Sequence, residues 1–169
     1  EALRSLYILR APRITRWMQV AYEIRPSSIA GQGIFANASI ARGTLLWKYE
    51  VGQSVLEHDA VSLRARLKDL STEEAVELLE HVYTWEGQVI EILDDGKFWN
   101  HARAALQNTG NHPDGEPPGD GLSSYALRDI PAGEELLDDY SLYDSVEWFQ
   151  DICREYGAAS CVSVGVSLS

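Results

Sequence analysis

The residues best suited to chemistry in this sequence lie in four short segments that are far apart along the chain. The segments are Gly31-Gln32-Gly33, Tyr83-Thr84-Trp85, Asn100-His101 and Asp138-Asp139-Tyr140. A glycine lets a ligand approach the main chain closely, asparagine and histidine offer hydrogen bonds, and the tyrosine offers a hydroxyl beside two carboxylates. Because the Gly-x-Gly pattern lacks a third glycine and a following helix, alone it predicts a tight turn and not a dinucleotide site.

Other patterns that could carry catalysis or hold a metal have a simpler interpretation. Glu134 and Glu135 look like a paired-carboxylate site, but within Pro-Ala-Gly-Glu-Glu they predict a turn in which one side chain fixes the backbone. Three histidines are expected at the surface: His58, His81 and His112. Since no carboxylate or cysteine lies at metal-ligand spacing from them, the sequence predicts no metal site.

The composition excludes several classes of protein. The chain has 169 residues, 45% of them hydrophobic, and lacks a run of about eighteen apolar residues that could span a membrane. Two cysteines, Cys153 and Cys161, are too few for a disulfide scaffold or a four-cysteine zinc site. The net charge of −12 disfavours direct binding to nucleic acid or to an anionic membrane surface.

The charge is unevenly distributed along the chain. Residues 1–22 contain four arginines and one glutamate, whereas residues 23–169 carry a net charge of −15. An arginine-rich, acid-poor start is similar to an organelle transit peptide. Two interpretations therefore remain open for the start of the chain: a targeting segment, or an ordered N-terminal extension over residues 1–19.

The elements that must position the four segments are mainly short strands. Strands are expected over residues 19–25, 45–51, 88–93, 123–130 and 136–143. Helical spacing over about 59–86 includes a capping box from Ser71 to Glu74, and a second amphipathic helix is expected over 145–156. The Gly- and Pro-rich residues 108–121 predict a loop.

These elements predict a mostly β domain of the α+β class. Strands and helices do not alternate along the chain, which argues against a doubly wound parallel sheet. The expected domain covers residues 20–157, with a helical insert at about 59–86 and a C-terminal tail over 158–169.

Three groups of residues together form a specific set. They are Gly31-Gln32-Gly33-Ile34-Phe35-Ala36 with the later Gly43-Thr44 and Tyr49; Phe98-Trp99-Asn100-His101; and the string RDIPAGEELLDDY over residues 128–140. In this order and spacing they resemble the SET domain of protein lysine methyltransferases. The resemblance covers about residues 20–157 and implies a fold of several small sheets with a C-terminal pseudoknot.

The resemblance also implies an activity, a cofactor and a set of site residues. The activity is transfer of a methyl group from S-adenosyl-L-methionine to a lysine side chain of a protein. Cofactor contacts are implied for Gly31, Gln32, Gly33, Phe35, Asn100 and His101. Tyr140 is implied to be the catalytic tyrosine that orients the incoming nitrogen. Tyr83 is a candidate for the wall of the lysine channel, with packing in the core as its alternative.

Such a reaction does not require a strong general base. A lysine with a free pKa of about 10.4 must lose a proton before it can attack, and both burial in an aromatic channel and a nearby sulfonium disfavour the charged amine. Much of the rate is then expected from alignment of the reactants.

The sequence departs from the family pattern at three positions. Ala102 stands where a serine usually follows Asn-His, and Gln107 precedes Asn108 where the family has a proline, two residues later than usual. Asp138 stands where many members have a Phe or Tyr that limits the number of methyl groups added. A SET-fold protein-binding module with weak or lost catalysis is therefore the alternative function.

The C-terminal helix has two interpretations. Its aromatic residues, Trp148, Phe149 and Tyr156, are expected either to pack the helix or to close the channel.

The acidic composition favours a basic partner. A negatively charged groove attracts lysine- and arginine-rich chains, so we expect a basic, lysine-containing protein or peptide, such as a histone, and no direct contact with nucleic acid or membrane. The expected compartment is intracellular, nuclear or cytoplasmic, and an organelle remains an alternative.

Overall fold

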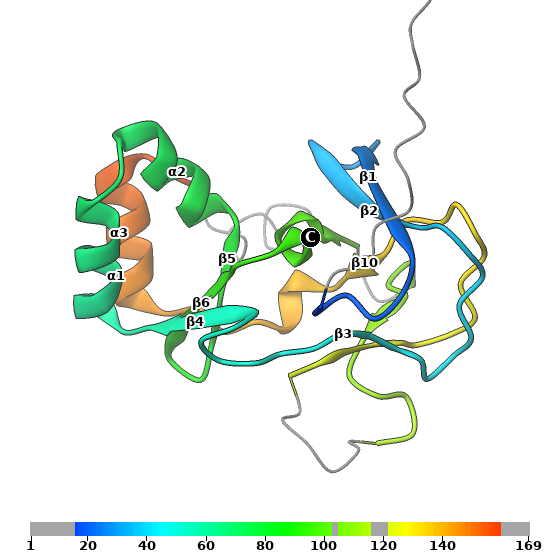
Figure 1. Ribbon diagram of the computed structural model, residues 1–169. Coiled ribbons are helices and arrows are strands. Elements are labelled where there is room, and N and C mark those ends of the chain that lie inside the picture. The colour runs from blue at the N-terminus through cyan, green and yellow to red at the C-terminus, as the bar shows by residue number, and fades with distance from the viewer. Residues whose placement is uncertain (1–15, 103–104, 116–121, 160–169) are drawn as a thin grey trace, which may run out of the picture.

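Over residues 16–102, 105–115 and 122–159, which the computed structural model describes, the chain forms four small β-sheets and three α-helices (Figure 1). The strands of the sheets are β1 (Tyr22–Pro26) and β2 (Gln32–Ala36); β3 (Leu45–Trp47), β9 (Ser124–Ala126) and β8 (Thr109–Gly110); β4 (Val55–His58), β6 (Gln88–Ile92) and β5 (Val82–Trp85); and β7 (Asn100–His101) with β10 (Leu137–Asp138). The pairings are antiparallel except that of β7 with β10, which is parallel. The expected mostly β, α+β class is thereby confirmed.

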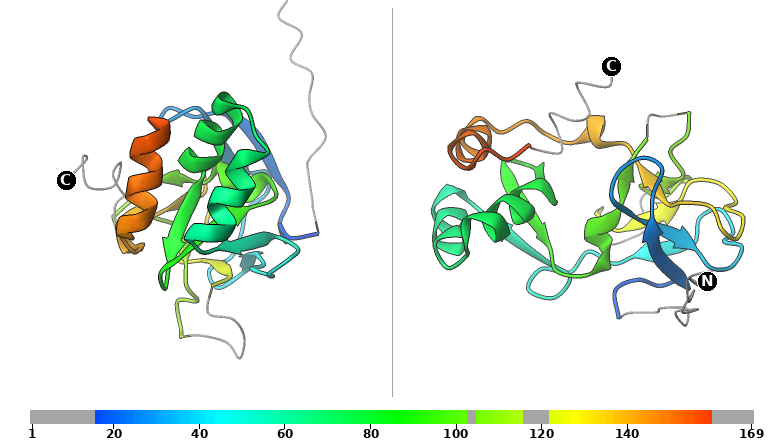
Figure 2. Two further views of the ribbon diagram at one scale, coloured as in Figure 1. Left: turned by 90° about the vertical axis from the view of Figure 1, so that its left-hand side faces the viewer. Right: turned by 90° about the horizontal axis from the view of Figure 1, so that it is seen from above.

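The helices form a layer of their own at one end of the molecule. They are α1 (Ala60–Lys68), α2 (Thr72–Glu80) and α3 (Glu147–Tyr156). Figure 2 shows the three helices side by side, beside the sheet of β4, β5 and β6. The capping box expected from Ser71 to Glu74 begins α2. Gly157, with φ +72°, ends α3 in the left-handed conformation that glycine favours.

Two hydrophobic cores hold these layers. The helical core includes Leu63, Leu79, Phe149 and Ile152, all fully buried, and Trp148 packs against it. The second core lies among the sheets and includes Tyr22, Ile34, Trp47 and Trp99. Since Phe149 is buried between helices, α3 is a packing helix, which was the first of the two alternatives expected for it.

The helical insert expected over 59–86 is shorter in the structure, because its last residues form a strand. Helical structure ends at Glu80, and Val82–Trp85 is β5, paired with β6. The connection between these strands is Glu86-Gly87, in which both residues have positive φ. Two successive residues of that conformation match the right-handed twist of a hairpin, so the turn chemistry overrides the helical spacing before it.

Two further expectations are corrected by short elements. The expected loop over 108–121 contains β8, and its residues 116–121 lie outside the described part of the chain. The strand expected over 136–143 is confined to β10, after which Tyr140–Leu142 forms a 3₁₀-helix, η2. Asp139 accepts a hydrogen bond from the Ser141 N–H and so begins η2, a local bond that competes with a continuing strand.

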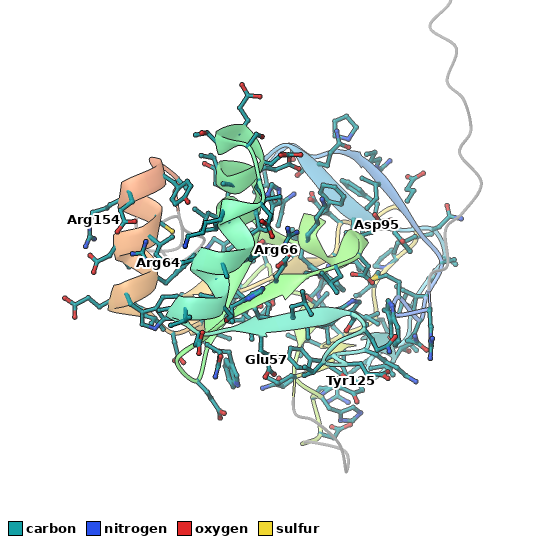
Figure 3. All side chains as sticks on the ribbon, turned by 60° about the vertical axis from the view of Figure 1, so that its left-hand side comes forward. Glu57, Arg64, Arg66, Asp95, Tyr125 and Arg154 are labelled. Atoms are coloured by element: carbon teal, nitrogen blue, oxygen red, sulfur yellow. The ribbon has the colours of Figure 1, made fainter. Side chains whose placement is uncertain are left out.

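His58 is buried, contrary to the expected surface position. It has 6% relative exposure, and its Nε2 lies 2.9 Å from Oε2 of Glu91. Arg66 of α1 donates to the same carboxylate, at 3.0 Å from Nη2. Arg64, which extends toward α3 in Figure 3, pairs instead with Glu155. Buried ionisable groups are usually paired, and Glu91 supplies the partner that the sequence alone did not identify.

Residues 134–138 are held by three parts of the chain that precede them. The Leu136 N–H donates to the carbonyl of Ile34, and the Ala102 N–H donates to the carbonyl of Asp138, both at 2.8 Å. The fully buried Asn108 accepts from the Leu137 N–H at 2.7 Å and donates to the Glu135 carbonyl at 2.7 Å. This segment therefore joins β2, β7 and the 108–109 region immediately before Tyr140.

Met18, which lies within the expected N-terminal extension, is fully buried in the core among the sheets. Of the expected extension over 1–19 and tail over 158–169, residues 1–15 and 160–169, with Cys161, lie outside the described residues. Among the described helices, none has the length and apolar character needed to cross a membrane.

Candidate active site

A cavity of about 1120 Å³ lies where these elements meet. Six of the eight site residues expected from the sequence line it: Gly31, Gln32, Tyr83, Asn100, His101 and Tyr140. Gly33 and Phe35 do not. Ligand cavities in proteins are typically about 300–1,000 Å³, so this cavity is large enough for a cofactor together with an inserted side chain.

The turn before β2 presents main chain to the cavity. Gly31 has φ +44°, and a Cβ added there would meet no atom within 4 Å. Nδ2 of Asn100 donates to the carbonyls of Ala30 and Gln32, at 3.1 and 3.0 Å. Asn100 therefore fixes the turn, and the open volume beside Gly31 is a place where a ligand can contact the backbone.

Gly33 does not line the cavity, and the space around it accounts for its lack of a side chain. A Cβ on Gly33 would collide with Oε1 of Glu135. That carboxylate accepts from Asn100 Nδ2 at 2.8 Å and from Ser27 Oγ at 3.0 Å. Gly33 thus gives space to the carboxylate that helps to hold the turn. Phe35 is buried, and the guanidinium of Arg25 covers its ring at 3.8 Å.

Tyr140 is held at both its backbone and its hydroxyl. Its N–H donates to Nδ1 of His101 at 3.0 Å, and its hydroxyl donates to the main-chain carbonyl of Trp99. Because Nδ1 of His101 is an acceptor, a neutral ring carries its proton on Nε2. That Nε2 is buried and has no partner among the described residues. Because His101 lies on β7 and Tyr140 follows β10, the parallel pairing of these two strands sets the position of the tyrosine.

Three tyrosine rings form one wall of the cavity, and we refer to Tyr83, Tyr140 and Tyr143 as the aromatic wall. Tyr83 stacks on Tyr143 with ring centroids 4.6 Å apart and planes at 26°, and Tyr140 lies 5.8 Å from Tyr143. Tyr83 lies on a strand, not on the helical face considered from the sequence. Tyr143 was not expected in the site, although its position one 3₁₀ turn after Tyr140 places both rings on one side.

Asp138 joins the aromatic wall to the loop before β8. Its carboxylate accepts from the Tyr143 hydroxyl, from the Asp139 N–H at 2.8 Å, and from Gln107 Nε2 at 3.3 Å. Burial raises the pKa of Asp138 above the ordinary aspartate value, although these hydrogen bonds oppose the shift. Burial, followed by the charge of Asp138, raises the pKa of Tyr143 well above its usual range.

The three departures from the family pattern have visible consequences. The Ala102 N–H continues the pairing of β7 with β10, so the missing hydroxyl does not interrupt it. Gln107, in place of a proline, donates to the Thr109 carbonyl at 2.9 Å as well as to Asp138. Asp138 itself introduces a carboxylate into the wall, where an aromatic ring is usual in the family.

The raised pKa of Asp138 predicts a pH dependence of stability. The folded protein binds the proton of the Asp138 carboxyl more tightly than the unfolded chain does, so ionisation of Asp138 opposes folding. Its contribution to the free energy of unfolding is complete below the ordinary aspartate pKa and is lost as pH rises through the raised value. We expect the melting temperature of Asp138→Asn, measured by thermal denaturation, to rise relative to that of the wild type as the pH increases from 4 to 7.

A matched control is available in the same segment. Asp144→Asn removes the same charge from an exposed side chain outside the cavity lining. Its melting temperature should follow the wild-type curve at every pH. An Asp138→Asn curve that stays parallel to wild type between pH 4 and 7 would contradict the raised pKa.

The sheets, the parallel β7–β10 pair and the cavity define a methyltransferase-type fold, and comparison with protein families agrees. The SET domain family model matches residues 31–141, which contain all eight site residues expected from the sequence. The chain belongs to the SET domain family, whose members are generally protein lysine methyltransferases that use S-adenosylmethionine. The comparison with curated proteins gives no match.

The residues of the cavity fit that cofactor. The open volume beside Gly31 can take a ligand against main chain that Asn100 has fixed. Lys97, which also lines the cavity, offers a cation for a carboxylate, and Glu77 lies 4.0 Å from its Nζ. Aromatic rings and carboxylates of the lining suit a sulfonium and an ammonium group.

Proposed function

We propose that this SET domain transfers a methyl group from S-adenosylmethionine to a lysine side chain of a protein. One observation carries the proposal: the main-chain turn at Gly31, which is open to a ligand, borders the same cavity as Tyr140 and the aromatic wall. A cofactor and an alkylammonium side chain therefore have matching surfaces within one enclosure.

The residues of the cavity have separable tasks in this mechanism. When bound, S-adenosylmethionine supplies an electrophilic methyl group on a sulfonium centre. The turn at Gly31, fixed by Asn100, binds it through main-chain atoms. The Tyr140 hydroxyl, oriented by the Trp99 carbonyl, positions the incoming nitrogen. The aromatic wall excludes water, and burial together with the nearby sulfonium disfavours the charged form of the amine, so that alignment supplies much of the rate.

The partner that we propose is a basic, lysine-containing protein or peptide. The net charge of −12 supports this proposal because opposite charge steers association. Histones belong to this class, as do many other basic proteins. Contact with nucleic acid would then be indirect, and the proposed compartment is intracellular, nuclear or cytoplasmic.

A binding module without catalysis is the second candidate function. Ala102 and Gln107, where the family has a serine and a proline, favour it because they alter the segment that follows Asn100-His101. In that case the cavity would hold a lysine side chain of a partner without modifying it.

Calorimetric titration with S-adenosylmethionine tests the enzymatic proposal. We expect saturable binding to the wild type, and transfer of a labelled methyl group to a lysine-rich peptide. Gly31→Ala should weaken cofactor binding by about tenfold, or about 1.4 kcal/mol, because its Cβ enters the volume beside the turn.

The control is Gly52→Ala, at another glycine of positive φ with open space around it but outside the cavity lining. The backbone strain is similar at both positions, so the two variants should lose similar stability. Only Gly31→Ala should lose affinity. Absence of heat and of a thermal shift at millimolar cofactor overturns the enzymatic proposal, and binding of a lysine peptide under the same conditions favours the binding module.

A further inference from the structure

Four acidic side chains line the cavity, and one of them is placed differently from the others. Glu77 and Glu80 are exposed at the end of α2, and Glu77 pairs with Lys97. Asp139 is buried and binds Ser141 through Oδ1, at 3.0 Å from its N and 2.6 Å from its Oγ. Asp138 is partly exposed, lines the cavity and contacts the aromatic wall. Asp138 therefore borders the space that a group would enter beside the tyrosines.

The carboxylate of Asp138 retains the capacity to accept one more hydrogen bond. An ionised carboxylate has about four lone-pair sites, two on each oxygen. Oδ1 accepts from the Asp139 N–H and from Gln107 Nε2, whereas Oδ2 accepts only from the Tyr143 hydroxyl among the described residues. One site on Oδ2 is left, beside the ring of Tyr143.

An aromatic face next to a carboxylate is a chemical environment that suits an alkylammonium group. The ring face attracts the cation, and the carboxylate oxygen accepts its N–H. An ammonium nitrogen has no lone pair, however, and must lose a proton before it can form a new bond. The sequence analysis expected no strong general base, but the structure brings a carboxylate to the aromatic wall.

We propose that Asp138 is the proton acceptor for the substrate ammonium, a role that rests on the function proposed above. A proton moves from the ammonium nitrogen to Oδ2, which leaves a neutral amine and a neutral carboxylic acid. The amine lone pair then forms the C–N bond as the methyl–sulfur bond breaks, and that electron pair stays on sulfur as a neutral thioether. The methylated product is a secondary ammonium ion, and Asp138 returns its proton to water.

The groups around Asp138 are consistent with this role. The hydroxyl of Tyr143 donates to the carboxylate, and the ring of Tyr83 stacks on that of Tyr143. His101, opposite Asp138 in the β7–β10 pair, accepts from the Tyr140 N–H. The charge of Asp139 adds to burial in raising the pKa of Asp138. A carboxylate with a raised pKa is a stronger base than an ordinary aspartate.

The test compares Asp138→Asn with Asp144→Asn on two peptides. One peptide carries lysine, and the other carries S-(2-aminoethyl)cysteine at the same position, whose amine is less basic because of the sulfur. With lysine, Asp138→Asn should lose about 10²–10⁴ in kcat, the range of general base catalysis. The loss should be smaller with the less basic amine and should diminish as pH rises. Asp144→Asn should match the wild type with both peptides.

A binding measurement gives a readout that does not depend on turnover. Without cofactor, the wild type should bind a lysine peptide more tightly than the same peptide with norleucine, and Asp138→Asn should abolish this preference. Circular dichroism melting verifies that both variants are folded. If Asp138→Asn transfers methyl groups at the wild-type rate, or loses activity equally with both amines, the role of Asp138 is wrong. A wild type that binds no S-adenosylmethionine overturns the proposed function itself, and the proton-acceptor role with it.

Discussion

Tyr140→Phe is expected to reduce methyl transfer by about 100-fold or more while S-adenosylmethionine still binds. The substitution removes the hydroxyl that donates to the Trp99 carbonyl. The backbone bond to His101 and the ring contact with Tyr143 remain. Since misplacement of a reacting group by about 1 Å can cost about 100-fold in rate, the loss should fall on kcat rather than on cofactor affinity.

Tyr125→Phe is the matched control for this variant. Tyr125, labelled in Figure 3, lies on β9, outside the cavity lining, and its ring packs against His112. Single-turnover transfer to a lysine-rich peptide and calorimetric titration of the cofactor should be measured on both variants. Full activity of Tyr140→Phe would mean that another group orients the nucleophile.

Asn108→Ala is expected to lower the free energy of unfolding by about 2–4 kcal/mol. The Asn108 side chain donates to the Glu134 carboxylate and the Glu135 carbonyl, and it accepts from the Leu137 N–H. Alanine leaves the Leu137 N–H and the Glu135 carbonyl, both partly buried, without these partners, and each such group costs about 1–3 kcal/mol. Asn108 has 0% exposure, so water cannot replace the lost bonds without movement of the segment.

Chemical denaturation with urea measures this loss, with Asn37→Ala as the control. Asn37 is exposed, and its substitution should change stability by less than about 0.5 kcal/mol. Asn108→Ala should also lower the affinity for S-adenosylmethionine, because Glu135 helps to fix Asn100. A variant as stable as Asn37→Ala would show that residues 134–138 are held without Asn108.

The sequence predicted the parts of the site that depend on local chemistry. Tyr140 follows a turn and an acidic pair whose spacing is specific, and Asn100 and His101 are adjacent. These three residues could therefore be predicted from their positions in the sequence, and all three line the cavity. Ser71 and Glu74 likewise predicted the start of α2, because a capping box is a property of four successive residues.

The parts that the sequence did not predict depend on distant partners. The helical spacing over about 59–86 continues past His81 because nothing before residue 86 marks a strand, whereas β5 is stabilised by pairing with β6. The close approach of Gly33 to Glu135 joins residues about a hundred positions apart. Asp138 and Tyr143 are only five residues apart in the sequence, but their contact depends on the 3₁₀ turn at Tyr140.

The hydrogen bonds that hold residues 134–138 also determine when this protein can acquire its cavity. Ser27 and Glu135, which bond through their side chains, are 108 residues apart, and Asn108 and Leu137 are 29 apart. Contacts of such long sequence separation form slowly, because the loop they close must first lose its conformational freedom. During synthesis, the β1–β2 hairpin and the α1–α2 pair can fold from local contacts as they emerge. The wall that contains Tyr140 cannot form until nearly the whole domain has left the ribosome, so the cavity is completed only late in synthesis.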